Sequence, residues 1–215
     1  VGRLQTLVFY LHQLHEEGRI GNVPIWVDSP LGHRATEVFR EHPECYDAEA
    51  NAFFLCGREP FSFERLHYAQ SIDDSKKLNT QKGPLVILSS SGMCEGGRVL
   101  HHLQRTVGDP RNIILIVGFQ AENTLGRRIV ERKSPLKILG DEFELNARVH
   151  TINALSAHAD RTALMRWFDG VKGNLSRVFA VHGEPEKVAA MTELVKQHGV
   201  ADAVAPVPGQ QFENV

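Results

Sequence analysis

Two histidines stand where a folded chain could use them for chemistry. His158 lies in the motif SAHAD (residues 156–160), between an expected strand and an expected helix, and His182 lies in VHGE (181–184), after a second strand. Open α/β sheets place ligands at such strand ends. A neutral imidazole there can bind a divalent metal or move a proton, with Asp160 and Glu184 as carboxylates that orient it. Taken singly, each histidine would more often be a helix cap or a surface residue.

Two turns have residues that suit a phosphate. SSSGM (89–93) follows an expected strand and precedes GGR (96–98), so serine hydroxyls, backbone N–H groups and a helix N-terminus could meet an anion. GFQ (118–120) is followed by Arg127 one turn into the next helix, and guanidinium groups bind phosphates well. The SSSGM turn has neither the P-loop nor the dinucleotide-binding pattern. An ordinary turn and a solvated helix face are the alternatives.

Composition limits the class of protein. The chain has 215 residues, 42% of them hydrophobic and 23% charged, which is enough for a sizeable core and too apolar for disorder. Its net charge is −2, so binding to nucleic acid would have to come from local patches. The three cysteines form no CxxC pair, which argues against a disulfide framework and a structural zinc site. The longest apolar run is far below membrane-spanning length, and we expect a cytoplasmic protein with no membrane partner.

The apolar spacing predicts alternating strands and helices over the first part of the chain. Strands are expected at 23–27, 66–70, 84–89 and 112–119, and helices at 3–17, 33–42, 96–106 and 122–131, with a further helix capped by Ser71. The segment 43–60 has no clean period. This order predicts an α/β fold with a mostly parallel sheet and helices on both faces.

The pattern changes near residues 133–135, and we place a domain boundary at 122–135. A hairpin is expected from the strand-like runs 137–139 and 142–152, which flank Gly140 and Asp141. After it come a helix at 161–171, a strand at 177–181, a helix at 185–198 and a strand at 203–207.

Taken together and in order, these blocks resemble the β-CASP family of metallo-β-lactamase-fold ribonucleases. That family includes bacterial and archaeal RNA-processing nucleases and the endonuclease subunit of the eukaryotic mRNA 3′-end cleavage machinery. Several short matches in fixed order are more specific than any one, and they cover nearly the whole chain. They are GRLQ (2–5), VDSP (27–30), SSSGM, GGR, GFQ, TLGR (124–127), SAHAD and VHGE.

The resemblance implies a domain layout. Residues 1–125 would be the β-CASP domain, and residues 126–215 the C-terminal strands and helices of the metallo-β-lactamase αββα fold. In the family, an HxHxDH metal-ligand cluster precedes the GRLQ block, and the chain begins at that block. We therefore expect the C-terminal part of a larger enzyme, inactive by itself.

The resemblance also implies roles for single residues. His158 matches a general acid beside the scissile phosphate, and His182 matches a ligand to one of two zinc ions that hold the attacking hydroxide. In the family, a histidine at the position of His182 is typical of the members that cleave RNA rather than DNA. Asp160 and Glu184 would support the two histidines. The residues expected to contact the RNA backbone are Ser91, Gly92, Arg98, Arg127 and Ser156.

Three functions compete on these observations. The first is a zinc-dependent ribonuclease acting on single-stranded RNA as an endonuclease, with 5′-exonuclease activity and a homodimer left open. The second is a non-catalytic β-CASP paralogue that binds RNA or scaffolds a processing complex, against which both histidines stand in intact motifs. The third, an unrelated doubly wound nucleotide-binding protein, lacks a glycine-rich nucleotide fingerprint.

Overall fold

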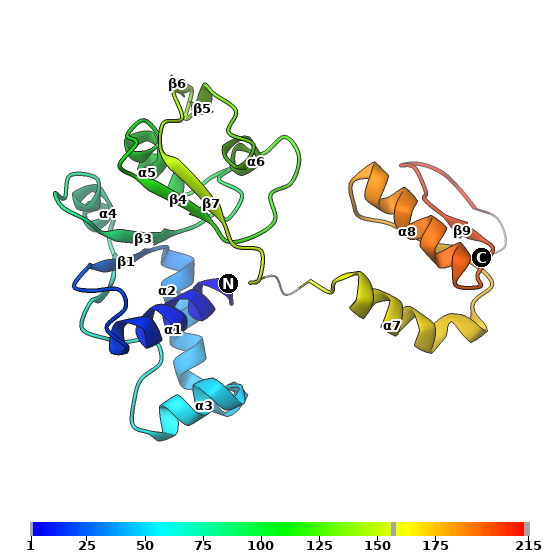
Figure 1. Cartoon of the computed structure of the whole chain (residues 1–215), viewed down its shortest axis with the longest axis horizontal. Helices are drawn as coiled ribbons and strands as arrows, with labels where there is room; N and C mark the ends of the chain where they lie inside the picture. Colours follow the sequence, from blue (N-terminus) through cyan, green and yellow to red (C-terminus); the bar gives the residue numbers. More distant parts are fainter. Residues whose placement is uncertain (1, 156–157, 213–215) are drawn as a thin grey trace. The chain divides into compact units, whose positions relative to one another are not determined.

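The computed structural model describes residues 2–155 and 158–212. The chain divides into two units, Val1–Ser156 and Ala157–Val215, and each has hydrophobic core residues of its own. Figure 1 shows helices and strands in both units, and the strands pair in parallel except in the β5–β6 hairpin. This mixed α/β architecture confirms the predicted fold class.

The first unit begins with helix α1 (Arg3–Glu16), as predicted, and continues into a three-stranded parallel sheet. The sheet has the order β2 (Leu66–Tyr68), β1 (Ile25–Asp28) and β3 (Val86–Ser89). Ile25 is in register with Leu66 on one side and with Val86 on the other. The fully buried members of this core lie on α1, on β1, and before and within β2: Val8, Ile25, Val27, Phe61 and Leu66.

Helix α2 (Pro30–Glu41) packs closely on α1 because its first turn carries a glycine. A Cβ at Gly32 would overlap the side chain of Leu4. Gln5 of α1 is buried and donates from Nε2 to Gly32 O at 3.2 Å and to Thr36 Oγ1 at 3.0 Å. The GRLQ block is therefore a helix-packing motif in this fold.

Between β1 and β2 the chain forms a helix that the sequence did not predict. The segment 43–60 contains the 3₁₀ turn η1 (Pro43–Cys45) and helix α3 (Ala48–Leu55), whose N-cap Asp47 accepts a hydrogen bond from Ala50 N at 2.9 Å. Helix α4 (Ile72–Leu78) follows β2, and Ser71 caps it as expected. The segment 43–60, which has no clean apolar period, thus contains regular structure that the sequence analysis did not assign.

A second core in the same unit joins β4 (Ile113–Ile116) to β7 (Arg148–Thr151) with helices α5 (Val99–Thr106) and α6 (Leu125–Val130). The hairpin is shorter than predicted and consists of β5 (Leu136–Ile138) and β6 (Asp141–Phe143). Residues 148–151 of the predicted second arm form β7 instead, which pairs in parallel with β4. Strand β4 is shorter than the strand expected at 112–119, and its residues alternate in burial, with Ile113 and Leu115 55% and 47% exposed.

The second unit contains α7 (Arg161–Val171), η2 (Lys172–Asn174), β8 (Val178–Phe179), α8 (Pro185–Gln197) and β9 (Ala203–Val204). These elements follow the predicted order, and β8 pairs in parallel with β9. Their core consists of Met165, Phe168, Val195, Val200 and Ala203. The domain boundary at 125–126 stays a prediction. None of the described helices is long and apolar enough to cross a bilayer.

Candidate functional site

His182 occupies an unusual backbone conformation three residues after β8. Its φ is 63°, in the left-handed region that few non-glycine residues adopt, and such residues often lie at functional sites. The next residue is Gly183, where a Cβ would come within 3.0 Å of Val188 Cγ2. Glu184 then occupies the N-cap position of α8 without a capping hydrogen bond from its side chain, and its carboxylate lies 2.9 Å from Lys187 Nζ. This turn leaves His182 exposed.

His158 is exposed and lies two residues before Asp160, the N-cap of α7. Asp160 Oδ1 accepts a hydrogen bond from Ala163 N at 2.7 Å, which satisfies one of the unpaired amides of the first turn. The structure thus gives Asp160 a capping role, and its role as a partner of His158 stays a prediction. The predicted RNA contact Ser156 lies outside the described residues.

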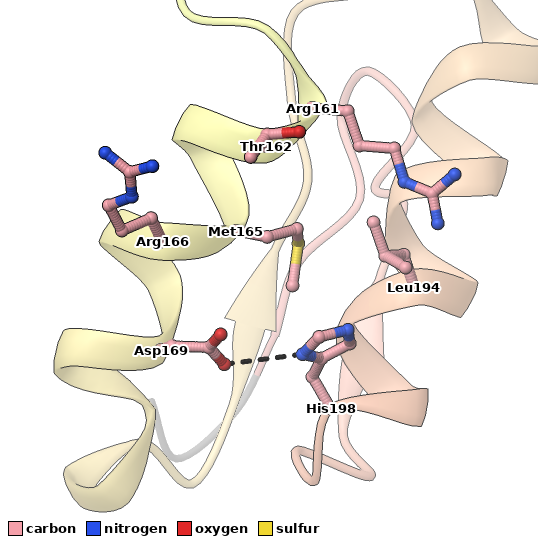
Figure 2. A pocket seen from close by; sticks show the side chains of 7 residues that line it. All are labelled: Arg161, Thr162, Met165, Arg166, Asp169, Leu194 and His198. Atoms are coloured by element: carbon pink, nitrogen blue, oxygen red, sulfur yellow. Dashed lines mark hydrogen bonds and ion pairs between the residues drawn. The ribbon is translucent and has the colours of Figure 1, made fainter.

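A groove of about 560 Å³ runs between α7 and α8. Figure 2 shows Met165 and Leu194 between the two helices, with Asp169 directed at His198, whose Nδ1 lies 3.3 Å from the carboxylate. Hydrogen bonds from Lys172 and then His198 hold the pKa of Asp169 below its ordinary value. His158 and His182 do not line this groove, so it is not where the two predicted catalytic residues would act.

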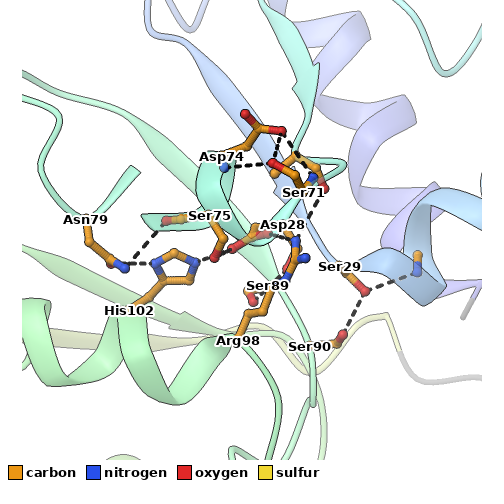
Figure 3. Close-up of polar contacts among 12 residues, drawn as sticks. Asp28, Ser29, Ser71, Asp74, Ser75, Asn79, Ser89, Ser90, Arg98 and His102 are labelled. Atoms are coloured by element: carbon orange, nitrogen blue, oxygen red, sulfur yellow. Dashed lines mark hydrogen bonds and ion pairs between the residues drawn. The ribbon is translucent and has the colours of Figure 1, made fainter. Parts of the chain in front are cut away.

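The first unit has a second polar site, at the carboxyl ends of β1 and β3. The connection from β1 leads to β2 on one side, while the chain later returns to β3 on the other side, so the strand order reverses here. Open parallel sheets bind ligands at such a switch point. Ser29 Oγ and Ser90 Oγ lie 2.7 Å apart across it, and Ser89 Oγ donates to Asp28 O at 2.9 Å (Figure 3).

Asp28, the last residue of β1, is fully buried and holds this site together. Its carboxylate accepts hydrogen bonds from Arg98 Nη1 at 2.5 Å, His102 Nε2 at 2.6 Å and Ser75 Oγ at 2.6 Å (Figure 3). Burial alone would raise the pKa of Asp28, but the hydrogen bonds from His102, Ser75 and Arg98 hold it below the ordinary value. The buried carboxylate is therefore charged and joins β1 to α4 and α5.

Arg98 is held by this network. Besides its ion pair with Asp28, its Nη1 lies 3.3 Å from Ala69 O, and the side chain is only 17% exposed. Arg127 is on α6, where its Nε lies 2.6 Å from Glu131 Oε1, four residues on. Contact of either arginine with RNA stays a prediction.

The turn containing Ser91 and Gly92 is tied to its neighbours through its backbone. Ser91 N donates to Gly96 O at 3.1 Å, and Gly92 O accepts from Gln120 Nε2 at 2.9 Å. Gly97 has φ 83°, and a Cβ there would lie 2.7 Å from Ser90 O, so this position needs glycine. Ser91 and Gly92 are both exposed, as an RNA contact requires.

Sequence comparison now decides the family. The model of the Beta-Casp domain matches residues 4–129, more than half of the chain. The chain belongs to the β-CASP family. A second model, the Zn-dependent metallo-hydrolase RNA specificity domain, matches residues 142–206, which include His158 and His182.

Two named relatives cover most of this β-CASP chain. Ribonuclease TTHA0252 of Thermus thermophilus is 38% identical over 199 residues, which is 93% of the chain and 45% of that protein. Transcription termination factor FttA of Pyrococcus abyssi is 33% identical over 193 residues, which is 87% of the chain and 30% of that factor. The chain thus spans less than half the length of either relative.

The second family model names zinc, but the described residues do not form a complete zinc site by themselves. A catalytic zinc takes three protein ligands from histidine, cysteine or carboxylate side chains. Over residues 2–155 and 158–212, no three such side chains gather in one place. His182 as a zinc ligand, and the number of ions, therefore stay predictions.

Sequence reasoning missed the residues that build the polar network of the β-CASP domain. Asp28 and Gln120 were noticed only as parts of motifs, and His102 was not singled out. One signal was present for Asp28, because a carboxylate that ends a buried apolar strand needs partners. Nothing local could point to His102, which lies 74 residues away along the chain.

Proposed function

We propose that the protein is a zinc-dependent ribonuclease, to which this chain contributes an RNA-binding surface and two catalytic histidines. The observation that carries the proposal is the left-handed turn at His182, inside the segment matched to the RNA specificity domain of Zn-dependent metallo-hydrolases. An exposed histidine in the left-handed region, after a half-buried strand, suits a side chain that reaches for a ligand. The ribonuclease name of the Thermus thermophilus relative supports the reaction class.

His158 acts in this proposal as the general acid. Its imidazole would donate a proton to the leaving oxygen as the phosphodiester bond breaks, a contribution of about 10²–10⁴ in rate. Asp160, two residues on, would keep the ring oriented, and Ser156 would contact the adjacent phosphate. His182 would bind zinc through its imidazole, supported by Glu184, with the remaining ligands supplied from outside the described residues.

The first unit would hold single-stranded RNA at the switch point of its sheet. Ser91 and Gly92 are exposed there, and Arg98 and Arg127 are the proposed cationic contacts. Internal cleavage in the cytoplasm is the activity that we propose first, with trimming from the 5′ end and action as a homodimer as further parts of the proposal. The FttA relatives carry the name of transcription termination factors, which makes nascent transcripts a substrate class to include.

The test compares the complete encoded protein with His158→Ala and His182→Ala variants on single-stranded RNA in the presence of zinc. We expect each variant to lose cleavage by at least about 100-fold while it still binds RNA, because both roles concern the chemical step. His198→Ala is the matched control, since this histidine lies in the α7–α8 groove with Asp169.

Two results would contradict the proposal. If the complete protein binds RNA and never cuts it, the protein is a non-catalytic RNA-binding scaffold and not a ribonuclease. Cleavage that persists in both variants would show that the two histidines do not have the proposed roles.

A further inference from the structure

Gln120 directs the backbone of the turn at Ser91 and Gly92. Its side chain is only 5% exposed, and Nε2 donates to Gly92 O at 2.9 Å, Gly118 O at 3.0 Å and Phe119 O at 3.1 Å. Three carbonyl oxygens around one nitrogen fix which end of the amide is the donor. The other end, Oε1, is buried and has no hydrogen-bond partner among the described residues.

Gly126 completes this arrangement from the start of α6. Its N–H donates to Met93 O at 3.0 Å, and a Cβ at this position would overlap Gln120 Oε1. Glu95 adds a third tie, because its Oε1 accepts from Leu125 N at 2.6 Å. The turn at residues 90–97 is therefore fastened to the turn at residues 118–126.

These hydrogen bonds decide which backbone groups face outward. The Gly92–Met93 peptide is trans, so its C=O and N–H point in opposite directions. Since Gly92 O points to Gln120, the N–H of Met93 points away from it. No acceptor in the described part of the chain takes the N–H of Gly92 or Met93, and both residues are exposed.

We propose that Gln120, whose side chain has room because residue 126 is glycine, is a positioning residue that turns the carbonyl of Gly92 inward, so that the N–H of Met93 and the neighbouring N–H of Gly92 bind a phosphate of RNA. Carbonyl oxygens would repel an anion, whereas successive outward N–H groups attract one. The pre-set backbone pays no ordering cost when RNA arrives. This inference rests on the proposed function, and it adds a phosphate contact through backbone amides to the contacts proposed for the arginines.

The first experiment reads the amide of Met93 directly. The complete protein is labelled with ¹⁵N-methionine, and the Met93 signal is assigned with a Met93→Leu variant. On addition of single-stranded RNA, the Met93 N–H should shift downfield as it donates to a phosphate oxygen, with the buried Met165 as reference. An RNA-binding protein whose Met93 signal does not move overturns the inference and leaves the proposed function standing.

The second experiment changes the donor. Gln120→Glu places a carboxylate oxygen against three carbonyls, so the turn should lose its orientation and RNA affinity should fall about tenfold, as expected for loss of a hydrogen bond to a charged group. Gln104→Glu is the matched control, because Gln104 Nε2 donates to Ile138 O at 3.4 Å, outside the turn. Unchanged affinity in a folded Gln120→Glu protein refutes the positioning role.

The outcomes separate the two claims. If the wild-type protein binds no RNA, the proposed function falls and this inference falls with it. If Gln120→Glu does not fold, the wild-type Met93 signal still shows whether the Met93 N–H binds RNA, because the signal either shifts or stays in place on addition of RNA.

Discussion

Asp28 joins three elements of the first unit through one buried carboxylate. Strand β1 carries it, α4 contributes Ser75, and α5 contributes His102 together with Arg98, the residue at its N-cap. A buried charge of this kind is stable only while its partners are present. Removal of the carboxylate would leave a guanidinium without its counter-ion in the same place.

We expect Asp28→Asn to lower the free energy of unfolding by about 3–5 kcal/mol, the usual effect of breaking a buried ion pair. Because the pKa of Asp28 is lowered on folding, its stabilising effect is complete above the ordinary pKa of an aspartate and is lost as the pH falls through the lowered pKa. Urea unfolding at several pH values measures this.

The difference between wild type and Asp28→Asn should therefore shrink in acid. Asp73→Asn is the control, since this carboxylate of α4 is 82% exposed and should change stability little. A difference that stays constant down to strongly acidic pH would show that the charge of Asp28 does not stabilise the fold.

At the residue scale, the sequence predicted where the motif residues lie in the fold better than it predicted which side chains contact one another. The positions of His158 and His182 near the ends of helices and strands follow from local spacing, and the structure has them there. The partners of Asp28 and Gln120 come from distant parts of the sequence. Hydrogen bonds across such separations form only once the fold brings the elements together, so local patterns could not predict them.

At the scale of elements, Asp160 has two roles that can be tested separately: it caps helix α7, and it is the proposed partner of His158. Asp160→Ala should lower stability by about 1 kcal/mol, because the amide of Ala163 loses its acceptor, whereas Asp160→Asn keeps a good capping side chain. Thermal unfolding of both variants measures the cap.

Cleavage assays on the same two variants measure the proposed partnership with His158. If Asp160 orients that imidazole through its charge, Asp160→Asn will cut RNA slowly in spite of normal stability. Full activity in Asp160→Asn would limit Asp160 to the cap seen in the structure.

Helices with a clear apolar face were predictable, and pairings between distant strands were not. Helices α1, α7 and α8 begin and end within about two residues of their predicted bounds. Helix α3 was missed because Phe53 is its only buried residue while Phe54 and Leu55 are exposed, which leaves no amphipathic spacing. The pairing of β7 with β4 depends on residues 35 positions apart, Ile113 and Arg148, and alternation alone cannot reveal it.

At the scale of the whole molecule, the net charge of −2 constrains how RNA binding responds to salt. Each phosphate neutralised on a single strand contributes a slope of about −0.7 to the plot of log affinity against log salt concentration. With Arg98 and Arg127 as proposed cationic contacts, we expect this chain's surface to contribute a shallow slope of about −1 to −2.

Arg98→Gln and Arg127→Gln, each made in the complete protein, should each reduce the slope by about 0.7. Because Arg98 is also the counter-ion of the buried Asp28, the Arg98→Gln comparison uses protein whose folded state is checked by thermal unfolding. Fluorescence anisotropy with labelled single-stranded RNA measures both. Gln120→Glu should weaken binding with the slope unchanged, since backbone N–H groups release no counter-ion. Slopes that do not respond to either arginine would place the cationic contacts elsewhere.

The parallel pairing of β4 with β7 has a consequence for biosynthesis. As the chain leaves the ribosome, β4 emerges at Ile113–Ile116, but its partner appears only at Arg148–Thr151, after α6 and the hairpin. Until then the edge of β4 that β7 will cover has unpaired N–H and C=O groups, which is a template for association with another nascent chain. The first unit therefore finishes folding only when its last residues are made, and an expression fragment that ends at residue 125 would keep that edge open permanently.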